Sequence, residues 1–413
     1  QQEYVNNVNI SGISLLGVIN DILDFSKIEA GMMDLEEIKI DLERILEESI
    51  DIVKYSAEQK GVELILSLGD PLPKYIITDP HKFKQILANL LGNAVKFTEK
   101  GEVEISVNFN QIDESSGILR IDVRDTGIGI SGEQRERLFK AFSQGDTSTT
   151  RKFGGTGLGL IISNKIAEKM GGEITLESEF EKGSTFTFSA PFLFSEFKKY
   201  ECFSDGINRR ALLIIENQAA ALSIKRLLNK ISFGCIIHQD PLTAIELLSK
   251  DPDFDLLICD ENLPYIDGIE AINIIRDKLF ISAERMPAIL LHSSGKAQYI
   301  KDKIGAAKGV TTICKPLKNS VLIDTVSFNN RVYDKPESDK SRESEETKQV
   351  VERVRILIAE DVKINFMMIN ALLASIYPDV DCYVAHNGQE AIDMVATLSP
   401  DLVLMDVQMP EVD

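Results

Sequence analysis

A short pattern that occurs twice constrains the fold more than any other feature of the sequence. Residues 255–260 read DLLICD and residues 401–406 read DLVLMD, and each run is followed by a proline and a further aspartate at the same spacing. Repetition at fixed spacing indicates two copies of one structural module. We expect the second copy, residues 353–413, to stop after its third strand.

The first copy, residues 209–326, alternates strand-like and helix-like segments five times. This order favours a doubly wound parallel sheet, in which chemistry lies at the carboxyl ends of the strands. The strands are predicted at residues 211–215, 235–238, 256–259, 288–291 and 310–313.

The remainder of the 413 residues divides by composition. Residues 34–195 alternate helical segments with strand-like runs at 103–109, 119–123 and 185–188, which indicates an α/β sandwich. Residues 196–208 and the charged stretch 327–352 are predicted linkers. Residues 1–33 form a helix whose apolar stripe, Val5 to Ile28, needs a partner helix.

Charge and composition exclude several classes of protein. The net charge is −20 and the pI about 4.8, which opposes direct binding to nucleic acid. Five cysteines without Cys-x-x-Cys spacing suggest neither a disulfide framework nor a zinc site. The chain starts at Gln1 without a signal peptide and stops directly after an apolar run, so we expect both ends to be cut.

One face of a predicted helix carries four polar residues at helical spacing. Amide oxygens can coordinate Mg²⁺, and an ammonium can lie against phosphate. Taken alone, the pattern is better explained by a solvated helix face. The four residues are Gln85, Asn89, Asn93 and Lys96.

Two glycine-rich segments follow. Asp125 comes directly after a strand-like run and precedes Gly127 and Gly129; its carboxylate could accept from an adenine amine, although a plain turn is the alternative. Residues 154–159 (GGTGLG) then open an apolar helical run, an arrangement that receives phosphate. No Gly-Lys-Ser/Thr follows, so this is not a Walker loop.

In order and spacing these segments resemble the N, first glycine, F and second glycine boxes of the histidine-kinase catalytic domain, of the GHKL (Bergerat) type. The F box and the lid are carried by residues 138–155. The resemblance implies an ATP site with Mg²⁺ on Asn93, phosphate on Lys96, adenine on Asp125 and a lid of Gly155, Gly157 and Gly159. It places the further ATP-binding residues at Asn89, Gly127, Gly129, Arg151, Thr156 and Leu158.

Asn89 separates kinase from hydrolase. Related ATPases such as gyrase place at this point a Glu that activates water, and an amide cannot act as a general base. We therefore expect phosphoryl transfer rather than hydrolysis.

Residues 19–31 resemble the second helix of the dimerisation and phosphoacceptor hairpin. The family's His-Glu pair belongs on the preceding helix, and no such motif occurs in this sequence. We expect the parent protein to form a homodimer through this hairpin and the present chain to be unable to phosphorylate itself. The four histidines (His81, His238, His292 and His386) do not resemble the acceptor.

The second repeat brings acidic residues to the ends of its strands. Glu360 and Asp361 follow one strand and Asp406 follows another, and a divalent cation would relieve their repulsion. The pattern resembles response-regulator receivers, which have a flavodoxin-like fold. The resemblance implies that Asp406 accepts a phosphoryl group beside Mg²⁺.

The first repeat departs from the receiver pattern. Glu216 is followed by Asn217 where a second acid is expected, while Asp260 and Lys315 fit the acceptor and the supporting lysine. The lost charge should weaken Mg²⁺ binding at Glu216 and Asp260. Both a weak or unphosphorylated receiver and a working one stay open.

Together the resemblances imply a hybrid sensor histidine kinase of two-component systems. It would use ATP and Mg²⁺ to phosphorylate a histidine, pass the group to receiver aspartates and then to a downstream phosphotransfer protein or response regulator. A regulatory module that binds nucleotide without turnover is the alternative. A cytoplasmic location is expected; whether the parent protein is anchored in the inner membrane stays open.

Overall fold

The computed structural model describes residues 30–135, 158–200, 209–296, 309–333, 355–360 and 381–406, with scattered residues of 19–28, 300–303 and 366–373. The chain divides into two compact units, Gln1–Lys335 and Pro336–Asp413. The first unit contains two sheets and the second contains one.

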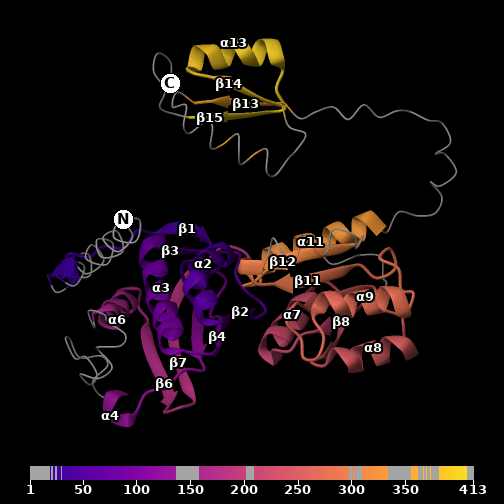
Figure 1. Cartoon of the computed structure of the whole chain (residues 1–413). Coiled ribbons are helices and arrows are strands. Elements are labelled where there is room, and N and C mark those ends of the chain that lie inside the picture. The colour runs from indigo at the N-terminus through magenta and orange to yellow at the C-terminus, as the bar shows by residue number, and fades with distance from the viewer. Residues whose placement is uncertain are drawn as a thin grey trace, which may run out of the picture. The chain divides into compact units, whose positions relative to one another are not determined.

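The first sheet has seven strands in the order β1-β3-β7-β5-β4-β2, with β6 paired to β7 (Figure 1). Its pairs are antiparallel except for β2 with β4, which are parallel. Because β2 stands at the end of the strand order, it is an edge strand. The strands are β1 (Ile38–Asp41), β2 (Val62–Leu68), β3 (Tyr75–Thr78), β4 (Gly101–Gln111), β5 (Ser116–Asp125), β6 (Glu173–Glu179) and β7 (Gly183–Phe194).

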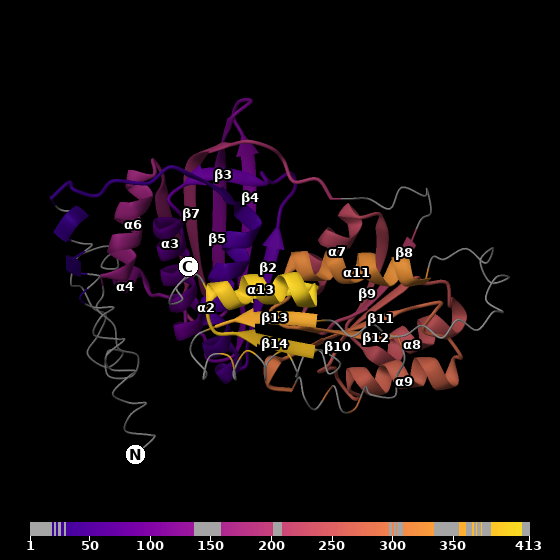
Figure 2. The same cartoon turned by 90° about the horizontal axis from the view of Figure 1, so that it is seen from above.

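Three helices pack against this sheet, namely α2 (Leu42–Lys60), α3 (Pro80–Phe97) and α6 (Gly159–Lys169), and a short α4 (Gly132–Arg135) follows β5. Figures 1 and 2 show α3 between α2 and α6. Buried apolar side chains of the helices and strands form one core, in which Phe83 meets Phe188 edge-on at 6.0 Å between ring centroids. The predicted α/β sandwich is confirmed.

The strands of this sheet extend beyond the apolar runs that predicted them. β4 and β5 pair along most of their length, from Val103 opposite Asp125 to Gln111 opposite Gly117. Backbone hydrogen bonds continue through the polar residues at strand ends, which an apolar pattern does not include.

The second sheet, in residues 209–314, has five parallel strands in the order β12-β11-β10-β8-β9. Helices α7 (Gln218–Lys230) and α11 (Asn319–Tyr333) cover one face, and α8 (Pro241–Lys250) and α9 (Gly268–Lys278) the other. The predicted doubly wound sheet is confirmed. The strands are β8 (Arg209–Ile214), β9 (Phe233–His238), β10 (Leu256–Asp260), β11 (Ala288–His292) and β12 (Val310–Cys314), and a 3₁₀ turn, η1 (Ser294–Lys296), follows β11.

The second unit repeats the start of this module. Three described parallel strands lie in the order β14-β13-β15, and α13 (Gly388–Leu398) packs on them. The strands are β13 (Arg355–Ala359), β14 (Asp381–Ala385) and β15 (Leu402–Met405).

The helix predicted from Val5 to Ile28 lies largely outside the described residues. Those of its apolar residues that are described include Ile19, Ile22 and Leu23, which are helical and 43%, 49% and 52% exposed. Among all described residues, none belongs to a helix with the length and apolar character needed to cross a membrane.

The start of α3 depends on one buried carboxylate. Asp79 accepts from the backbone N–H groups of His81 (2.9 Å) and Lys82 (3.0 Å), and from that of Glu36 (3.2 Å). Asp79→Ala should therefore lower the free energy of unfolding by about 1–2 kcal/mol, measured by urea denaturation. Asp41→Ala removes the cap of α2, which is a single hydrogen bond from the Arg44 N–H, and should lower the free energy of unfolding by less. An equal loss in both variants would contradict the larger role given to Asp79.

Candidate active site

Asn89 and Asn93 lie one turn apart on α3 and are joined to each other and to α6. The Nδ2 of Asn93 donates to Oδ1 of Asn89 at 3.3 Å, and the Nδ2 of Asn89 donates to the Ser163 hydroxyl at 2.9 Å. Asn89 is thus held between two partners. The Asn93 amide, oriented by its donated bond, carries the Oδ1 that could serve a hard cation.

α6 begins where α3 approaches it most closely. A Cβ on Gly159, the first residue of α6, would lie 2.4 Å from Oδ1 of Asn89. Leu158 is buried directly before it, and no side chain caps the first turn of α6. The first N–H groups of this helix are therefore oriented toward the same corner as the asparagines, and such groups favour an anion.

Asp125 ends β5 and is only 5% exposed. Its Oδ1 accepts from the Gly127 N–H at 2.8 Å. Burial raises the pKa of the carboxyl, opposed by hydrogen bonds from Gly127 and Ser184. A carboxylate with one oxygen fixed by a backbone donor presents its other oxygen to a second donor, such as an exocyclic amine.

Glycines allow the turn after Asp125 to lie close to its neighbours. A Cβ on Gly127 would lie 2.4 Å from the Phe97 carbonyl oxygen, and Gly129 has a φ of +65°. Gly129 also lies against the backbone of Glu179. Side chains at these two positions would displace the strand end that carries Asp125.

Lys96 lies near the end of α3, on the same face as Asn93. Burial lowers the pKa of its ammonium, and the nearby Lys60 lowers it further. Its Nζ lies 5.2 Å from the centre of the Phe97 ring. A partly buried ammonium that is disfavoured by its surroundings gains most from an anionic ligand.

The structure thus joins Asn89, Asn93 and Gly159 directly, and it places Asp125, Gly127 and Gly129 together at the end of β5. Four predicted ATP-binding residues lie outside the described residues, as does one receiver acid. They are Arg151, Gly155, Thr156 and Gly157, and Asp361.

Ser163 was not predicted from the sequence, although it holds Asn89 in place. The signal was available, because Ser163 follows Gly159 by four residues and so lies on the same face of α6. Ser184, which also contacts Asp125, comes from β7 and has no such signal.

The described residues fit a bound Mg-nucleotide. The buried carboxylate is an acceptor that an amine could join beside Gly127 and Ser184, the asparagine amide offers an oxygen, and the close approach of Gly159 leaves backbone N–H groups of α6 beside it. This donor set combines a base-recognition group, a hard-cation ligand and phosphate ligands.

In the five-stranded domain, Asp260 lies at the carboxyl end of the central strand β10 and is almost fully buried. Lys315 follows β12, and its Nζ lies 2.8 Å from the Oδ1 of Asp260. Burial raises the pKa of Asp260 to about 6, although the neighbouring Lys315 ammonium acts to lower it. The predicted pair of acceptor and lysine is therefore in contact.

Asn217 and His292 make local contacts at this edge of the sheet. Asn217 caps α7 by accepting from Ala220 N at 3.0 Å, while Glu216 beside it is exposed. His292 is buried and its Nδ1 lies 2.8 Å from the Ser293 carbonyl oxygen. Among the described residues no three His, Cys, Asp or Glu side chains gather as a metal site.

In the second unit, Glu360 and Asp406 follow the adjacent strands β13 and β15. The Asp406 N–H donates to the Ala359 carbonyl at 3.0 Å, which brings the two strand ends together. Glu360 is buried.

Comparisons with known proteins agree with this geometry. Residues 78–193 match the family described as histidine kinase-, DNA gyrase B- and HSP90-like ATPase. Residues 212–327 and 356–413 match the response regulator receiver domain.

Relatives combine both domains. The chain is 31% identical over its whole length to the signal transduction histidine-protein kinase BarA of Escherichia coli, of which it covers 44%. It is 36% identical over 76% of its length to the autoinducer 2 sensor kinase/phosphatase LuxQ of Vibrio vulnificus, of which it covers 37%. The chain is homologous to hybrid sensor histidine kinases. The resemblance predicted from the boxes and the repeat is confirmed.

A solved structure of the family supports the arrangement. The crystal structure of full-length ShkA in complex with AMPPNP is 26% identical, with a TM-score of 0.65, over 100% of this chain and 81% of that one. The chain spans less than half the length of the curated hybrid kinases it matches.

Proposed function

We propose that this chain is the catalytic and receiver portion of an ATP-dependent protein histidine kinase. The observation that carries the proposal is the asparagine pair on α3, held against Gly159 and Ser163, together with the buried Asp125 at the end of β5. The relatives are described as histidine kinases, and a relative was solved with the ATP analogue AMPPNP.

Each predicted residue has a role in this proposal. Asp125 accepts from the adenine amine while Gly127 fixes its other oxygen. Asn93 supplies an amide oxygen to Mg²⁺, and Lys96 neutralises phosphate charge. Bound Mg²⁺ would neutralise charge on the transferred phosphoryl group. Arg151, Gly155, Thr156 and Gly157 are proposed to complete the lid.

Asn89 favours transfer over hydrolysis. Its two amide atoms are engaged by Asn93 and Ser163, and an amide has no basic lone pair with which to remove a proton from water. The chain therefore positions ATP for attack by another group, and positioning contributes most of the rate in phosphoryl transfer.

The acceptor and the partners are proposed from the family. The target is a histidine on a dimerisation hairpin, whose second helix is residues 1–33, and the exposed Ile19, Ile22 and Leu23 are apolar residues that such a hairpin would cover. Asp260 and Asp406 are the proposed receiver acceptors, and a phosphotransfer protein or response regulator lies downstream. The domain boundaries 34–195, 209–326 and 353–413 and a cytoplasmic location are part of the same proposal.

The fate of the γ-phosphoryl group tests the choice of kinase over hydrolase. The chain of residues 1–413, incubated with Mg-ATP, should release inorganic phosphate at less than about one turnover per minute, because no general base is present at Asn89. Phosphate release is followed by a coupled optical assay, with Asp125→Asn as the blank for contaminating ATPases. Sustained release well above that blank would favour a hydrolase.

A further inference from the structure

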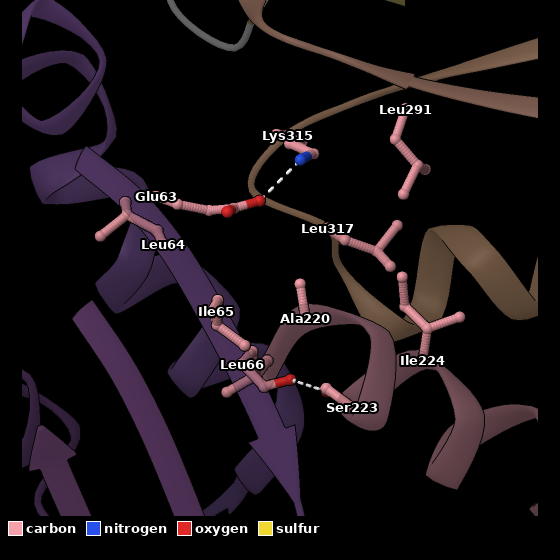
Figure 3. A pocket seen from close by; sticks show the side chains of 10 residues that line it. All are labelled: Glu63, Leu64, Ile65, Leu66, Ala220, Ser223, Ile224, Leu291, Lys315 and Leu317. Atoms are coloured by element: carbon pink, nitrogen blue, oxygen red, sulfur yellow. Dashed lines mark hydrogen bonds and ion pairs between the residues drawn. The ribbon is translucent and has the colours of Figure 1, made fainter. Parts of the chain in front are cut away.

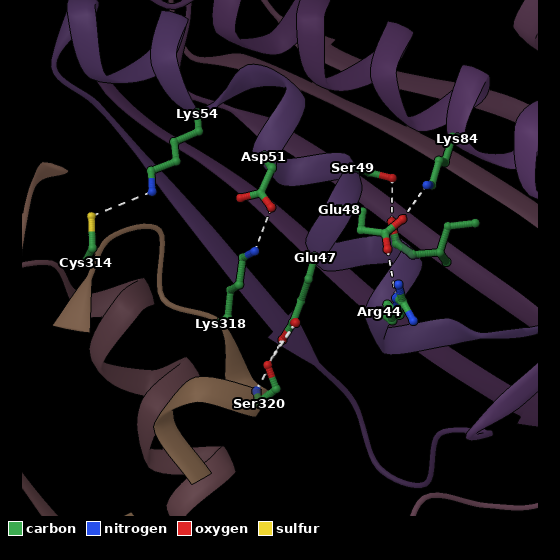
Figure 4. A network of polar contacts seen from close by, with 11 residues as sticks. Arg44, Glu47, Glu48, Ser49, Asp51, Lys54, Lys84, Cys314, Lys318 and Ser320 are labelled. Carbon is green, nitrogen blue, oxygen red and sulfur yellow. Dashed lines mark hydrogen bonds and ion pairs between the residues drawn. The ribbon is translucent and has the colours of Figure 1, made fainter. Parts of the chain in front are cut away.

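The acceptor edge of the five-stranded receiver does not face solvent in this unit. It faces α2, β2 and the start of β4 of the ATPase domain (Figures 3 and 4). The residues that follow β8, β11 and β12 all take part, and these are the strand ends at which receiver chemistry would occur.

Most ion pairs and hydrogen bonds of this contact join a carboxylate of the ATPase domain to a donor of the receiver, although Lys54 of the ATPase domain also lies there, against Cys314. The Lys318 Nζ lies 2.6 Å from Asp51 Oδ2, and the Gly295 N–H donates to Glu58 at 2.7 Å. The ATPase domain supplies carboxylates and the receiver supplies cationic, hydroxyl and amide donors. The carboxylates are those of Glu47, Asp51, Glu58, Glu63 and Glu102.

The contact also covers an open sheet edge. β2 is the edge strand of the ATPase sheet, and α7 of the receiver lies along it. The Ser223 hydroxyl donates to the Leu66 carbonyl at 2.5 Å, and the Lys230 ammonium to that of Gly69 at 2.8 Å. These bonds satisfy a carbonyl group of the edge strand and one just beyond its end, and so cover part of the open edge.

Lys315 is the residue through which the contact reaches the acceptor. Its Nζ lies 2.8 Å from Asp260 Oδ1 and 2.6 Å from Glu63 Oε1 on β2. The Lys315 side chain is 28% exposed and that of Glu63 is 23% exposed. One ammonium therefore serves two carboxylates, one from each domain.

We propose that the acceptor edge of this receiver is a docking surface for the ATPase domain of the same chain, and that docking and phosphorylation of Asp260 exclude each other. Glu63 takes the lysine that a phosphoryl group on Asp260 would need. In the docked state the Glu63 carboxylate also lies on the ammonium that contacts Asp260, so a further anion on Asp260 is repelled. Phosphorylation would leave Glu63 opposite a dianion and release the receiver.

Docking is tested by the accessibility of a cysteine at the contact. Cys314 lies at the contact, its Sγ 3.7 Å from the Lys54 Nζ, and its rate of modification by a maleimide is followed by peptide mass spectrometry on the full chain. Asp51→Lys reverses the ion pair with Lys318 and should raise the Cys314 rate roughly fivefold or more. The swap Asp51→Lys with Lys318→Asp should return the rate to that of wild type.

The control is Glu173→Lys, the same change of charge on an exposed residue of β6, which pairs with β7 and not with β2. It should leave the Cys314 rate unchanged. Equal Cys314 rates in wild type and Asp51→Lys, or no recovery in the swap, would overturn the docking.

Exclusion is tested with acetyl phosphate and Mg²⁺, so that the ATPase reaction plays no part. The background is Asp406→Asn, which removes the other proposed acceptor. A carboxylate oxygen of Asp260 attacks phosphorus, the bond from phosphorus to the acetate oxygen breaks, and acetate leaves with that electron pair. Hydroxylamine-labile label on Asp260 should form several-fold faster in Asp51→Lys and in Glu63→Gln than in wild type, and the swap should slow it again. Equal labelling of Asp260 in wild type and in the undocked Asp51→Lys chain, including none in both, would overturn the exclusion.

Discussion

Asp125→Asn is expected to weaken binding of Mg-ATP about 10- to 100-fold, the value of one hydrogen bond to a buried charged group. In the native site Gly127 and Ser184 donate to this carboxylate, and its two oxygens have further lone pairs with which to accept from the adenine amine. An amide that keeps its oxygen toward Gly127 turns an NH₂ group toward adenine, and two donors then face each other. Affinity is measured by titration with a fluorescent ATP analogue.

A nearby aspartate provides the matched control. Asp122 lies three residues earlier on β5, on the opposite face of the strand, where it pairs with Arg120 and Thr187. Asp122→Asn removes the same charge and should leave nucleotide affinity unchanged. Equal affinity of wild type and Asp125→Asn would remove the adenine assignment, and an equal loss in Asp122→Asn would reduce it to a general effect of charge.

The second large effect is expected at the start of α6. Gly159→Ala places a methyl group 2.4 Å from Oδ1 of Asn89, which cannot move away freely because Ser163 and Asn93 hold it. Displacing Asn89 also displaces Asn93, the proposed Mg²⁺ ligand. We expect the gain in ATP affinity that Mg²⁺ provides in wild type to fall roughly tenfold in the variant, measured by calorimetry with Mg²⁺ and with EDTA.

Gly92→Ala is the control for this substitution. Gly92 lies within α3, and a Cβ there would meet no atom within 4 Å. The alanine should raise the free energy of unfolding by about 0.5–1 kcal/mol and leave the Mg²⁺-dependent gain intact. A normal gain in Gly159→Ala would show that its contact with Asn89 does not position the metal ligand.

Local patterns predicted much of this fold. The repeat that ends in Asp260 and Asp406 predicted two copies of a parallel sheet. It could be recognised because an apolar run that ends in a carboxylate is a feature of a single strand. The helical spacing of Asn89 and Asn93 likewise placed them on one face of α3. Each of these inferences needs only one element and its period.

Contacts between elements distant in sequence were not predictable in the same way. Glu63 was not expected to matter, yet it shares Lys315 with Asp260. Asn217 was interpreted as a lost carboxylate, whereas the structure also gives it a role as the cap of α7 and a bond of 2.7 Å to Glu102. Pairing between two surfaces leaves no periodic trace along one chain.

His81 and His292 are poorly placed to receive a phosphoryl group from this site. His81 lies in the first turn of α3, twelve residues before Asn93, which corresponds to about 18 Å along the helix. In-line transfer requires approach to about 3–3.5 Å. His292 is buried in the receiver beside Ser293.

Transfer of label to a supplied acceptor tests the central claim most directly. The chain of residues 1–413 is incubated with γ-labelled ATP and Mg²⁺, with and without a separate helical hairpin that carries a His-Glu pair, and the products are treated with acid and base. We expect acid-labile, base-stable label on the hairpin, none on the chain alone, and a large loss of label with Asp125→Asn. Acid-labile, base-stable label on the chain by itself, or a hairpin that stays unlabelled while ATP is bound, would contradict the account.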